Sequence, residues 1–374
     1  MKTKRYDKRL VTCLLVTAVI FGGVSFASAA EDQAQEEVEA PKDEWIITKN
    51  PYDGVVWEDY GQYLGSLHNH TTESDGGNDP AHVIDEYHEA GFKILAISDH
   101  NHVTWPWQDY GRDPEELGMV AIVANELSRH HHTNSHFTRY PRPFREASTG
   151  DLETSLAEHE ELGGFSHLNH PGRYWDPNDD GEVDDHVLQR YADLFKEYPS
   201  LLGMEIHNQD DRFPEDRLLW DALLTEFMPR RGIWGFANDD SHNSGHVGLN
   251  AIVFLLPELD KDRARLALAR GQFYATTIAT HPHEERDLDK APVIQIINYD
   301  AEAGTLTIEA ESGGEPVPSD AYTWISGGGK TVQDSGTVLD LNETEGLDRY
   351  LRVEIRGAGG TAYTQPFGVR IRPE

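Results

Sequence analysis

The strongest constraint on the fold is a repeated association of short apolar runs with residues that commonly bind metals. Six such runs are each followed closely by His, Asp, Glu or Asn, and helical patterns separate several of them. This alternation is typical of βα units that build a parallel sheet or barrel. The carboxyl ends of parallel strands meet at one rim, so we expect the six polar groups to lie together there. These groups are residues 68–70, 98–100, 125–126, 166–170, 205–207 and 238–242.

The segment after the first run carries clear helix signals. Asp79 is a good N-cap, and Pro80 suits the first helical position. Val83, Ile84 and Tyr87 are spaced to lie on one helical face, and a glycine at position 91 can end the helix. A helix should therefore connect the first strand of the sheet to the second.

Two pairs of residues at a spacing of two form the clearest metal-binding pattern. His68 and His70 project to the same side of an extended chain, so both imidazoles can bind one ion. Asp240 and His242 repeat this spacing. The only cysteine is Cys13, which excludes a thiolate-rich site, and a mixed set of imidazoles and carboxylates favours Zn, Mn or Fe. The carboxylates available to complete the set are those of Asp75, Glu126 and Asp240.

In their order along the chain, these motifs resemble the motif set of the PHP (polymerase and histidinol phosphatase) family of metallohydrolases. The similarity extends over about residues 56–280, and its specificity comes from six motifs in the same order. Residues 271–276 also resemble the segment that closes that domain. The motifs are His68-Asn69-His70-Thr71, Ser74-Asp75-Gly76, Ser98-Asp99-His100, Asn125-Glu126, Asn169-His170-Pro171-Gly172 and Asp240-Ser241-His242.

The resemblance implies an α/β fold with a distorted (β/α)7 barrel over residues 56–285, holding two or three divalent metal ions. The implied ligands of the first ion are His68, His70, Glu126 and Asp240. Glu126 would bridge to a second ion, whose other implied ligands are His136 and His170. The implied ligands of a third ion are Asp75, His100 and His242.

Two of these assignments have competitors in the sequence. His136 competes with the run His130-His131-His132, which could equally be a solvated loop, and His167 competes with His170. We favour His170 because a Pro-Gly pair follows it. We favour His136 because it lies further past Glu126, where the chain could return to the rim.

For catalysis, the resemblance implies that Glu126, Asp240 and His242 act at the metal centre. Arg173, which follows the His-Pro-Gly motif, is the best-placed cation for phosphoryl oxygens, since a guanidinium can bind phosphate through two contacts. The alternative for Arg173 is a surface salt bridge. Weaker candidates are Arg139, Arg142 and Arg145.

Other rim residues have expected supporting roles. Asp99, beside His100, is more plausible as a group that orients an imidazole than as a ligand. Glu205 and His207 follow a later strand, and they either line the pocket or are hydrogen-bonded parts of the barrel.

The amino-terminal residues predict export. Basic residues precede an apolar stretch at 10–26, and Ala27-Ser28-Ala29 has the small-residue pattern of a signal-peptidase site. We therefore expect residues 1–29 to be a cleaved signal peptide, a secreted or periplasmic location, and no membrane span after cleavage. The alternative is an uncleaved anchor. Residues 30–55 are expected to be an acidic linker and lead-in, because the linker has few large apolar residues to bury.

The chain changes character near its carboxyl end. Residues 286–374 contain short alternating strands separated by Gly, Pro, Asn and Asp turns. This pattern predicts a small all-β domain, an immunoglobulin-like sandwich. The expected strands are residues 293–297, 305–311, 322–326, 337–341, 350–355 and 368–371.

The overall charge restricts the partners. The chain has 66 acidic and 32 basic residues and a formal charge of -34, so bulk charge disfavours binding to nucleic acids. Divalent ions in a cleft lined with carboxylates would still attract a small phosphoester. The sequence leaves the oligomeric state open.

A second, weaker metal pattern lies at residues 176–183. Asp176, Asn178 and Asp180 occupy positions of a calcium loop, but Val187 stands where a bidentate glutamate is expected. The pattern allows a structural calcium ion. Its alternative is an acidic Asx turn.

The sequence therefore supports three functional hypotheses. The first is a secreted metal-dependent phosphoesterase that hydrolyses a small phosphomonoester or phosphodiester. The second uses the same metal site to hydrolyse a carboxylic ester, carbamate or amide. The third is an exported protein that binds metal or glycan without catalysis.

Overall fold

The computed structural model describes residues 44–128, 131–139, 152–278 and 287–373. Residues 43–374 form one compact unit of mixed α/β structure. The expected signal segment and most of the expected linker lie outside the described residues. Among the helices that are described, none is both long enough and apolar enough to cross a membrane.

The expected βα rhythm is present in the first half of the compact unit. Parallel ladders join β2 to β3, β3 to β4, β6 to β7 and β7 to β8, whereas β5 runs antiparallel to both of its neighbours. The strands of this series are β2 (Gly61–Ser66), β3 (Ile94–Ile97), β4 (Val120–Leu127), β5 (Thr133–His136), β6 (Phe165–Leu168), β7 (Leu201–Asn208) and β8 (Trp234–Asn238).

Two further strands extend the sheet on the other side of β2. Strand β9 (Asn250–Leu256) pairs antiparallel with β2, and β10 (Phe273–Thr277) pairs antiparallel with β9. The sheet is therefore mixed and not purely parallel. No ladder among the described residues joins β8 back to β9. Closure into a seven-stranded barrel stays a prediction.

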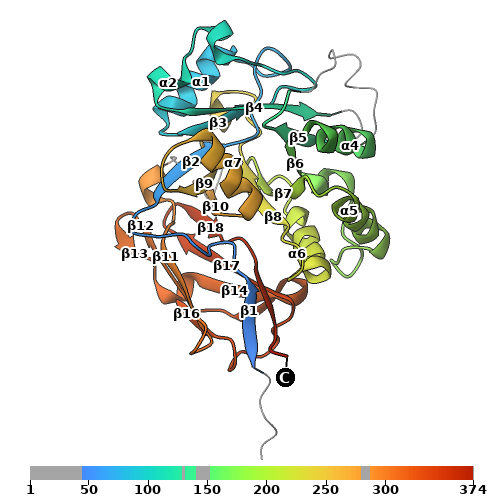
Figure 1. Ribbon diagram of the computed structural model, residues 1–374, viewed down its shortest axis with the longest axis vertical. Coiled ribbons are helices and arrows are strands. Elements are labelled where there is room, and N and C mark those ends of the chain that lie inside the picture. The colour runs from blue at the N-terminus through green and yellow to red at the C-terminus, as the bar shows by residue number, and fades with distance from the viewer. Residues whose placement is uncertain (1–43, 129–130, 140–151, 279–286, 374) are drawn as a thin grey trace, which may run out of the picture. The chain divides into compact units, whose positions relative to one another are not determined.

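Helices α4, α5 and α6 lie along one side of this sheet, while α1 and α2 lie at its upper end in Figure 1. The helices are α1 (Pro80–Glu89), α2 (Pro114–Leu117), α4 (Leu152–Leu162), α5 (Asp185–Glu197), α6 (Glu215–Phe227) and α7 (Lys261–Arg270). Short 3-10 helices are η1 (Trp107–Tyr110), η2 (Pro171–Tyr174), η3 (Ser244–His246), η4 (Leu288–Lys290), η5 (Ser319–Ala321) and η6 (Gly327–Gly329).

Helix α1 forms for the reasons expected from its sequence. The Asp79 carboxylate accepts a hydrogen bond from the His82 backbone N–H at 3.0 Å, which satisfies one of the free donors of the first turn. Such a cap stabilises a helix by about 1 kcal/mol. Val83, Ile84 and Tyr87 are buried on the sheet-facing side of the helix. The chain then turns into β3, whose polar end reaches the rim.

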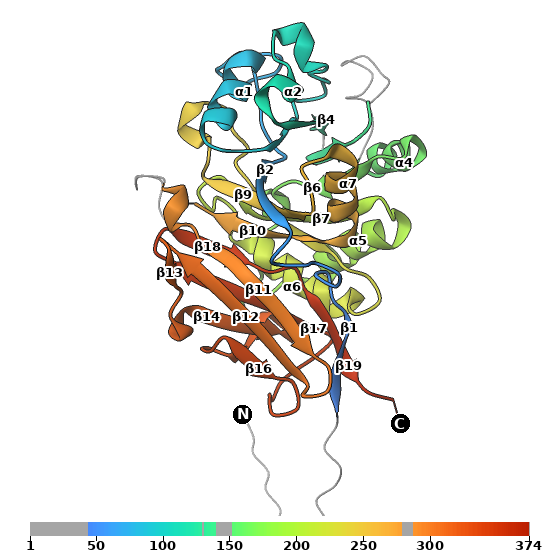
Figure 2. The same ribbon diagram turned by 60° about the vertical axis from the view of Figure 1, so that its left-hand side comes forward.

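The carboxyl-terminal strands form two layers. Sheet β11-β12-β13 with β16 is separate, whereas β14, β15, β17, β18 and β19 continue the large sheet. Figure 2 shows β11 and β12 in front of β14 and β17. The strands are β11 (Val293–Asp300), β12 (Thr305–Ser312), β13 (Glu315–Pro316), β14 (Tyr322–Ser326), β15 (Lys330–Gln333), β16 (Val338–Asp340), β17 (Tyr350–Gly357), β18 (Gly360–Tyr363) and β19 (Phe367–Ile371).

One hydrophobic cluster fills the space between these layers. It contains Ile294 and Ile308 from the separate sheet, Trp324 and Val353 from the large sheet, and Tyr274 from β10. The six strands expected from the sequence are all present, with shifts of a few residues at their ends. Their classification as an immunoglobulin-like sandwich stays a prediction, because one layer is continuous with the β/α sheet.

Strand β1 (Trp45–Lys49) differs from expectation. We expected these residues to belong to the acidic linker, with the fold beginning near residue 54, but they pair antiparallel with β19 at the opposite end of the chain. A five-residue run has too few alternating positions to identify a strand by itself. Its partner lies about 320 residues away, so the pairing could not be inferred locally.

A buried polar junction ties the carboxyl-terminal strands to helix α6. Arg352 donates two hydrogen bonds of 2.7 Å to the Asp221 carboxylate, and Tyr350 donates a third of 2.7 Å. Nearby, the Gln365 side chain donates to the Gly235 carbonyl at 2.8 Å and accepts from its N–H at 2.9 Å. Every charge at this junction therefore has a partner within the protein, as buried charges require.

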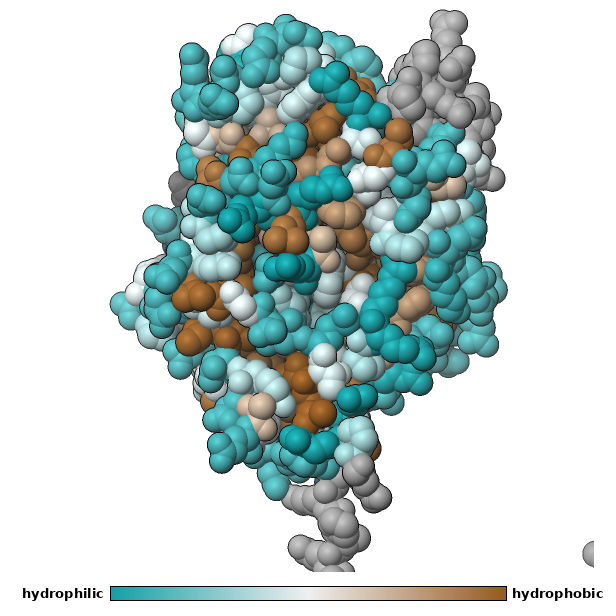
Figure 3. Space-filling view, viewed as in Figure 1, coloured by the Kyte–Doolittle hydropathy of each residue, from teal (hydrophilic) through white to brown (hydrophobic). Residues whose placement is uncertain are grey.

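The surface seen in Figure 3 is mainly hydrophilic, with separate apolar patches. This agrees with the strong excess of acidic residues in the sequence.

Candidate metal centre

Polar side chains at the carboxyl ends of five segments converge on one cavity. Two isolated parallel bridges, Asn69 with Ser241 and His100 with Glu126, hold neighbouring strand ends together. The converging side chains are His68 and His70 after β2, His100 after β3, Glu126 near the end of β4, His170 after β6, and Asp240 and His242 after β8.

The innermost group joins His68, His70 and Glu126. One ligand atom from each lies within 4.8 Å of the others, and Asp240 forms a similar group with His68 and His170. Asp240 Oδ1 is 3.1 Å from His70 Nε2 and 3.3 Å from His68 Nε2. All these residues are buried. The structure thus brings together the four ligands that the resemblance implies for a first ion.

Glu126 also faces a second group, formed with His100 and His132. Its Oε2 is 2.7 Å from His100 Nδ1, and its Oε1 is 2.8 Å from His132 Nδ1. One carboxylate therefore reaches two candidate ion positions, as a bridging ligand must.

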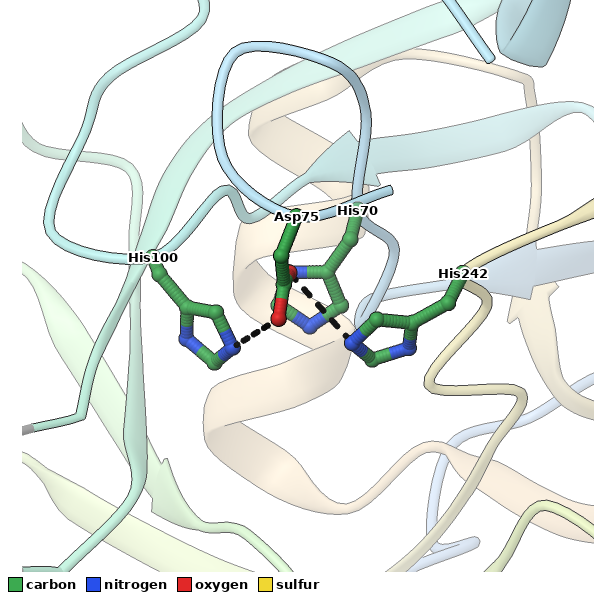
Figure 4. A group of neighbouring side chains, drawn as sticks. All are labelled: His70, Asp75, His100 and His242. Atoms are coloured by element: carbon green, nitrogen blue, oxygen red, sulfur yellow. Dashed lines mark ion pairs between the residues drawn. The ribbon is translucent and has the colours of Figure 1, made fainter. Parts of the chain in front are cut away.

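A third group joins His70, Asp75, His100 and His242. Figure 4 shows the Asp75 carboxylate between the rings of His100 and His242, with the His70 ring beside it. Asp75 Oδ1 is 3.4 Å from His242 Nε2, and its Oδ2 is 3.5 Å from His100 Nε2. The Asp75 side chain is 58% exposed, so this group is the one closest to solvent.

The structure differs from the sequence-based assignment at His136. Strand β5 runs antiparallel to β4, so residue 132 lies at the rim and the chain then moves away from it. The extended strand rises by about 13 Å between His132 and His136, so His136 lies away from the rim. His132 takes the rim position instead, and His136 Nε2 lies 3.1 Å from His167 Nδ1 in the interior. Burial lowers the pKa of His136 well below its ordinary value, so this ring stays neutral.

The structure brings His170, and not His167, to the candidate ligand groups. His170 has a φ of 29°, a conformation that is costly for a residue with a side chain. Asp240 has a φ of 44° and shares this feature. Backbone strain of this kind concentrates at binding and catalytic sites.

Glu205 forms hydrogen bonds that position two of the candidate ligands. Its Oε1 accepts a hydrogen bond from His68 Nδ1 at 2.8 Å, and its Oε2 accepts one from the His170 backbone N–H at 2.8 Å. Side-chain amides of Asn208 and Asn238 each donate to it at 2.9 Å. Burial alone would raise the pKa of Glu205, but His68 and His167 more than offset this, so the carboxylate stays charged. It therefore turns His68 Nε2 towards the cavity.

The charge balance of the cluster fits divalent cations. Burial alone would raise the pKa of Glu126, but His68, His100 and His132 hold its pKa well below the usual value. The pKa of Asp240 is likewise held low, by His68 and His70, against the effect of burial. Nδ1 of His70 and Nδ1 of His170 are buried and make no hydrogen bond within the described residues. Buried anions beside such nitrogens form a donor set suited to a cation.

Asp99 has a different role from the one expected. Its carboxylate accepts hydrogen bonds from the backbone and hydroxyl of Thr71, each at 2.7 Å, and from the hydroxyls of Ser74 and Thr104. Among the described residues it does not bond to an imidazole. It braces the turn that carries Asp75. Gly76 in this turn lies so close to the His70 carbonyl that a Cβ would be 2.5 Å from its oxygen, so only glycine fits.

The ligand groups form one wall of a cavity of about 340 Å³. Arg173 lies on its lining, as the sequence predicts. Arg139 is exposed and is not part of this lining, and Arg142 and Arg145 lie outside the described residues. The wall without ligands is formed by Arg173, Gln209, Arg212 and His246. Only the first of these was identified from the sequence, since the others belong to no recognisable motif.

The candidate calcium loop is an Asx turn in this structure. The Asn178 side-chain oxygen accepts hydrogen bonds from the backbone N–H groups of Asp180 at 3.0 Å and Glu182 at 2.9 Å. Asp176, Asn178 and Asp180 form none of the potential metal groups found among the described residues. A structural calcium ion stays a prediction.

Comparison with known proteins gives similarity only at the level of structure. No family profile and no curated protein matches the sequence. One similar structure is a two-domain protein from Bacteroides vulgatus ATCC 8482 that contains a predicted PHP-like metal-dependent phosphoesterase. The identity is 16% and the TM-score 0.46, and the match covers 88% of this chain and 99% of that one.

Two other similar structures match a smaller part of the chain. An amidohydrolase from Chromobacterium violaceum, with bound sulfate and no metal, is 15% identical, with a TM-score of 0.36 and coverage of 48% of this chain and 87% of that one. The lesion-specific endonuclease PfuEndoQ from Pyrococcus furiosus is 12% identical, with a TM-score of 0.37 and coverage of 56% of each chain. These similarities do not assign the chain to a family.

Proposed function

We propose that the protein is a metal-dependent hydrolase that cleaves a small phosphomonoester or phosphodiester. The observation that carries this proposal is the position of Glu126 between candidate ligand groups. Glu126 belongs to two groups, and its two carboxylate oxygens face different histidines. A bridging carboxylate allows ions to lie close together at one cavity, which is the arrangement that hydrolytic centres with several ions require.

We assign each candidate ligand to an ion so that every imidazole serves one ion only. His68, His70, Glu126 and Asp240 would hold one ion, Glu126 with His132 and His170 a second, and Asp75 with His100 and His242 a third. Divalent cations at such a site activate water and neutralise charge on the electrophile. Glu205 keeps the His68 ring in position, and Arg173 reaches the cavity with a guanidinium that can bind phosphoryl oxygens in two contacts.

The cavity favours a phosphoester over a carbonyl substrate. Its lining is polar and includes two guanidinium groups in addition to the ligand groups. A phosphoryl group has several anionic oxygens that such donors can bind, whereas an uncharged ester or amide offers one carbonyl oxygen. Hydrolysis of a carboxylic ester, carbamate or amide is the second candidate, because the same ligands would serve it.

A hydrolysis screen of the purified protein tests the proposal. Metal-free protein is loaded with Mn or Zn and incubated with phosphomonoesters, phosphodiesters, aryl esters and amides. We expect turnover of phosphoesters that is lost after chelation, lost in His70→Ala and unchanged in His186→Ala, whose side chain on α5 is 80% exposed. Turnover of carboxylic esters or amides alone would favour the second candidate. Bound metal with no turnover of any substrate would favour a non-catalytic binding protein.

We also propose that the protein is exported. The basic start, the apolar stretch and the Ala-Ser-Ala site of residues 1–29 support this location. Mass spectrometry of protein from the cell exterior or periplasm should find a chain that begins at residue 30. An intact amino terminus on protein confined to the cytoplasm would contradict export.

A further inference from the structure

We infer that Arg212, with Gln209, forms a recognition site for a second anionic group on the substrate, and that this site selects substrates carrying a carboxylate or phosphate beside the scissile phosphoester. The inference rests on the proposed function and adds the substrate class. Gln209 and Arg212 line the same cavity as the metal-ligand groups and Arg173.

Arg173 and Arg212 bring two cations to the cavity. Among the described residues, neither has an acidic side chain within the 4.0 Å of an ion pair. Their guanidinium groups lie instead over the neighbouring rings of Tyr174 and Phe213. Two cations without acidic partners therefore face one cavity, and an anionic ligand would neutralise their charge.

The loop that carries Arg212 is held in a fixed conformation. Gln209 and Asp211 both have positive φ, 50° and 66°, which costs free energy in residues other than glycine. The Asp211 carboxylate accepts two hydrogen bonds from Arg217, of 2.7 and 2.8 Å. Such a loop persists only because its surroundings enforce it, and strain of this kind marks ligand-binding segments.

This loop is hydrogen-bonded to a candidate metal ligand. The Gln209 side chain donates to the Asp240 carbonyl at 3.0 Å, and the Gln209 carbonyl accepts from the Asn250 side chain at 2.8 Å. Because Asp240 belongs to the metal cluster, the position of Gln209 is fixed relative to the ions. Arg212 lies three residues further on, so it can hold one end of a substrate whose other end is at the ions.

The two cations lie on different segments and suit different groups. Arg173 lies in η2, three residues after the candidate ligand His170, whereas Arg212 is on the separate loop after β7. Arg173 is therefore placed to bind the phosphoryl group under attack. A cavity of about 340 Å³ admits a small molecule, and its second anionic group then lies against Arg212.

Matched substrate pairs test this inference. Glycerol 3-phosphate and 3-phosphoglycerate differ by one carboxylate, and fructose 6-phosphate and fructose 1,6-bisphosphate differ by one phosphate. The metal-loaded full chain should prefer the more anionic member of at least one pair, and which pair it prefers identifies the second group. Arg212→Gln should lower kcat/KM for that member by about tenfold, mainly through KM, and change the other member less than about twofold.

Two further variants separate charge from structure. Arg212→Lys should keep part of the preference, because it keeps the charge, and Arg356→Gln, an exposed change on β17, should keep all of it. Equal losses for both members of a pair, or no loss, would overturn the inference while leaving the hydrolase proposal intact. Absence of turnover for every phosphoester would contradict the proposed function. In that case calorimetry measures the affinity of the protein for both members of each pair. Equal affinities would overturn the inference as well.

Discussion

The polar rim and the junction between β17 and α6 both bury charged side chains, but the buried charges have different kinds of partner in the two regions. At the junction, Arg352 donates two hydrogen bonds to Asp221, and Tyr350 adds a third. At the rim, Glu126 and Asp240 lie among imidazoles, and several buried ring nitrogens make no hydrogen bond with any described residue. At the junction every buried charge has a partner within the protein, whereas the rim side chains form groups that could hold metal ions. The difference separates a structural use of buried charge from a functional one.

The comparison predicts its largest effect on stability at the junction. Arg352→Met removes one partner and leaves the Asp221 carboxylate buried with only Tyr350. The free energy of unfolding should fall by about 3 to 5 kcal/mol, because an unpaired buried charge is costly. Denaturant unfolding measures this change, and Arg356→Met on the exposed side of β17 is the control, with an expected change below about 0.5 kcal/mol.

The double variant Arg352→Met with Asp221→Leu sharpens this prediction. It removes both charges, so it should recover most of the stability lost in Arg352→Met. If the double variant were as unstable as the single one, loss of packing and not an unpaired charge would be the cause.

At the rim, truncation of a candidate ligand should lower the stability of the metal-loaded protein more than that of the metal-free protein. His70→Ala removes a ring shared by two ligand groups. Stabilisation by Mn or Zn at about 1,000 times the dissociation constant should be about 4 kcal/mol in the parent protein and largely absent in the variant. The metal-free variant should lose less stability than this, and that loss comes from the buried ring that faces Asp240. Thermal unfolding with and without metal checks both statements, with His186→Ala as the control. A large loss of stability in the metal-free state would contradict the functional reading of the rim.

A smaller effect, on metal affinity, is expected at Glu205, which contacts the candidate ligand His68. Glu205→Gln keeps the size of the side chain but replaces the carboxylate that accepts from His68 Nδ1. Metal affinity, measured by competition with a chelator, should fall between about 10-fold and about 100-fold. Glu89→Gln on the surface of α1 is the control. Unchanged affinity would show that Glu205 does not position His68.

The smallest effect concerns pH and Asp216. This carboxyl on α6 accepts from the Gly172 N–H at 2.5 Å, and burial raises the pKa of Asp216 well above its ordinary value. Because the folded pKa is raised, its contribution to stability is present below the unfolded pKa and is lost as pH rises through the folded pKa. Asp216→Asn should therefore gain stability relative to the parent as pH rises. Unfolding curves at several pH values measure this, and parallel stability profiles would contradict it.

Much of the rim could be predicted because its ligands follow strands in a fixed chain order. His68, His70, His100 and Asp240 come directly after apolar runs, so the strand pattern alone brings them to one edge. His136 shows the limit of such reasoning. Its position depends on β5 reversing direction, and a four-residue strand of polar residues carries no signal of that reversal.

Other features could not be predicted because they depend on contacts between distant residues. Strand β1 is identified by its pairing with β19, and the junction by contacts between α6 and β17. Arg212 has no motif around it, and only the fold places it at the cavity. Local sequence shows propensities and spacing, whereas these features follow from tertiary packing.

Anomalous diffraction from crystals grown with Mn or Zn tests the central claim most directly. The account predicts two or three peaks at the rim, one of them between His70, Asp75, His100 and His242, and one beside Glu126. A crystal saturated with either metal that shows no peak among these side chains would contradict it.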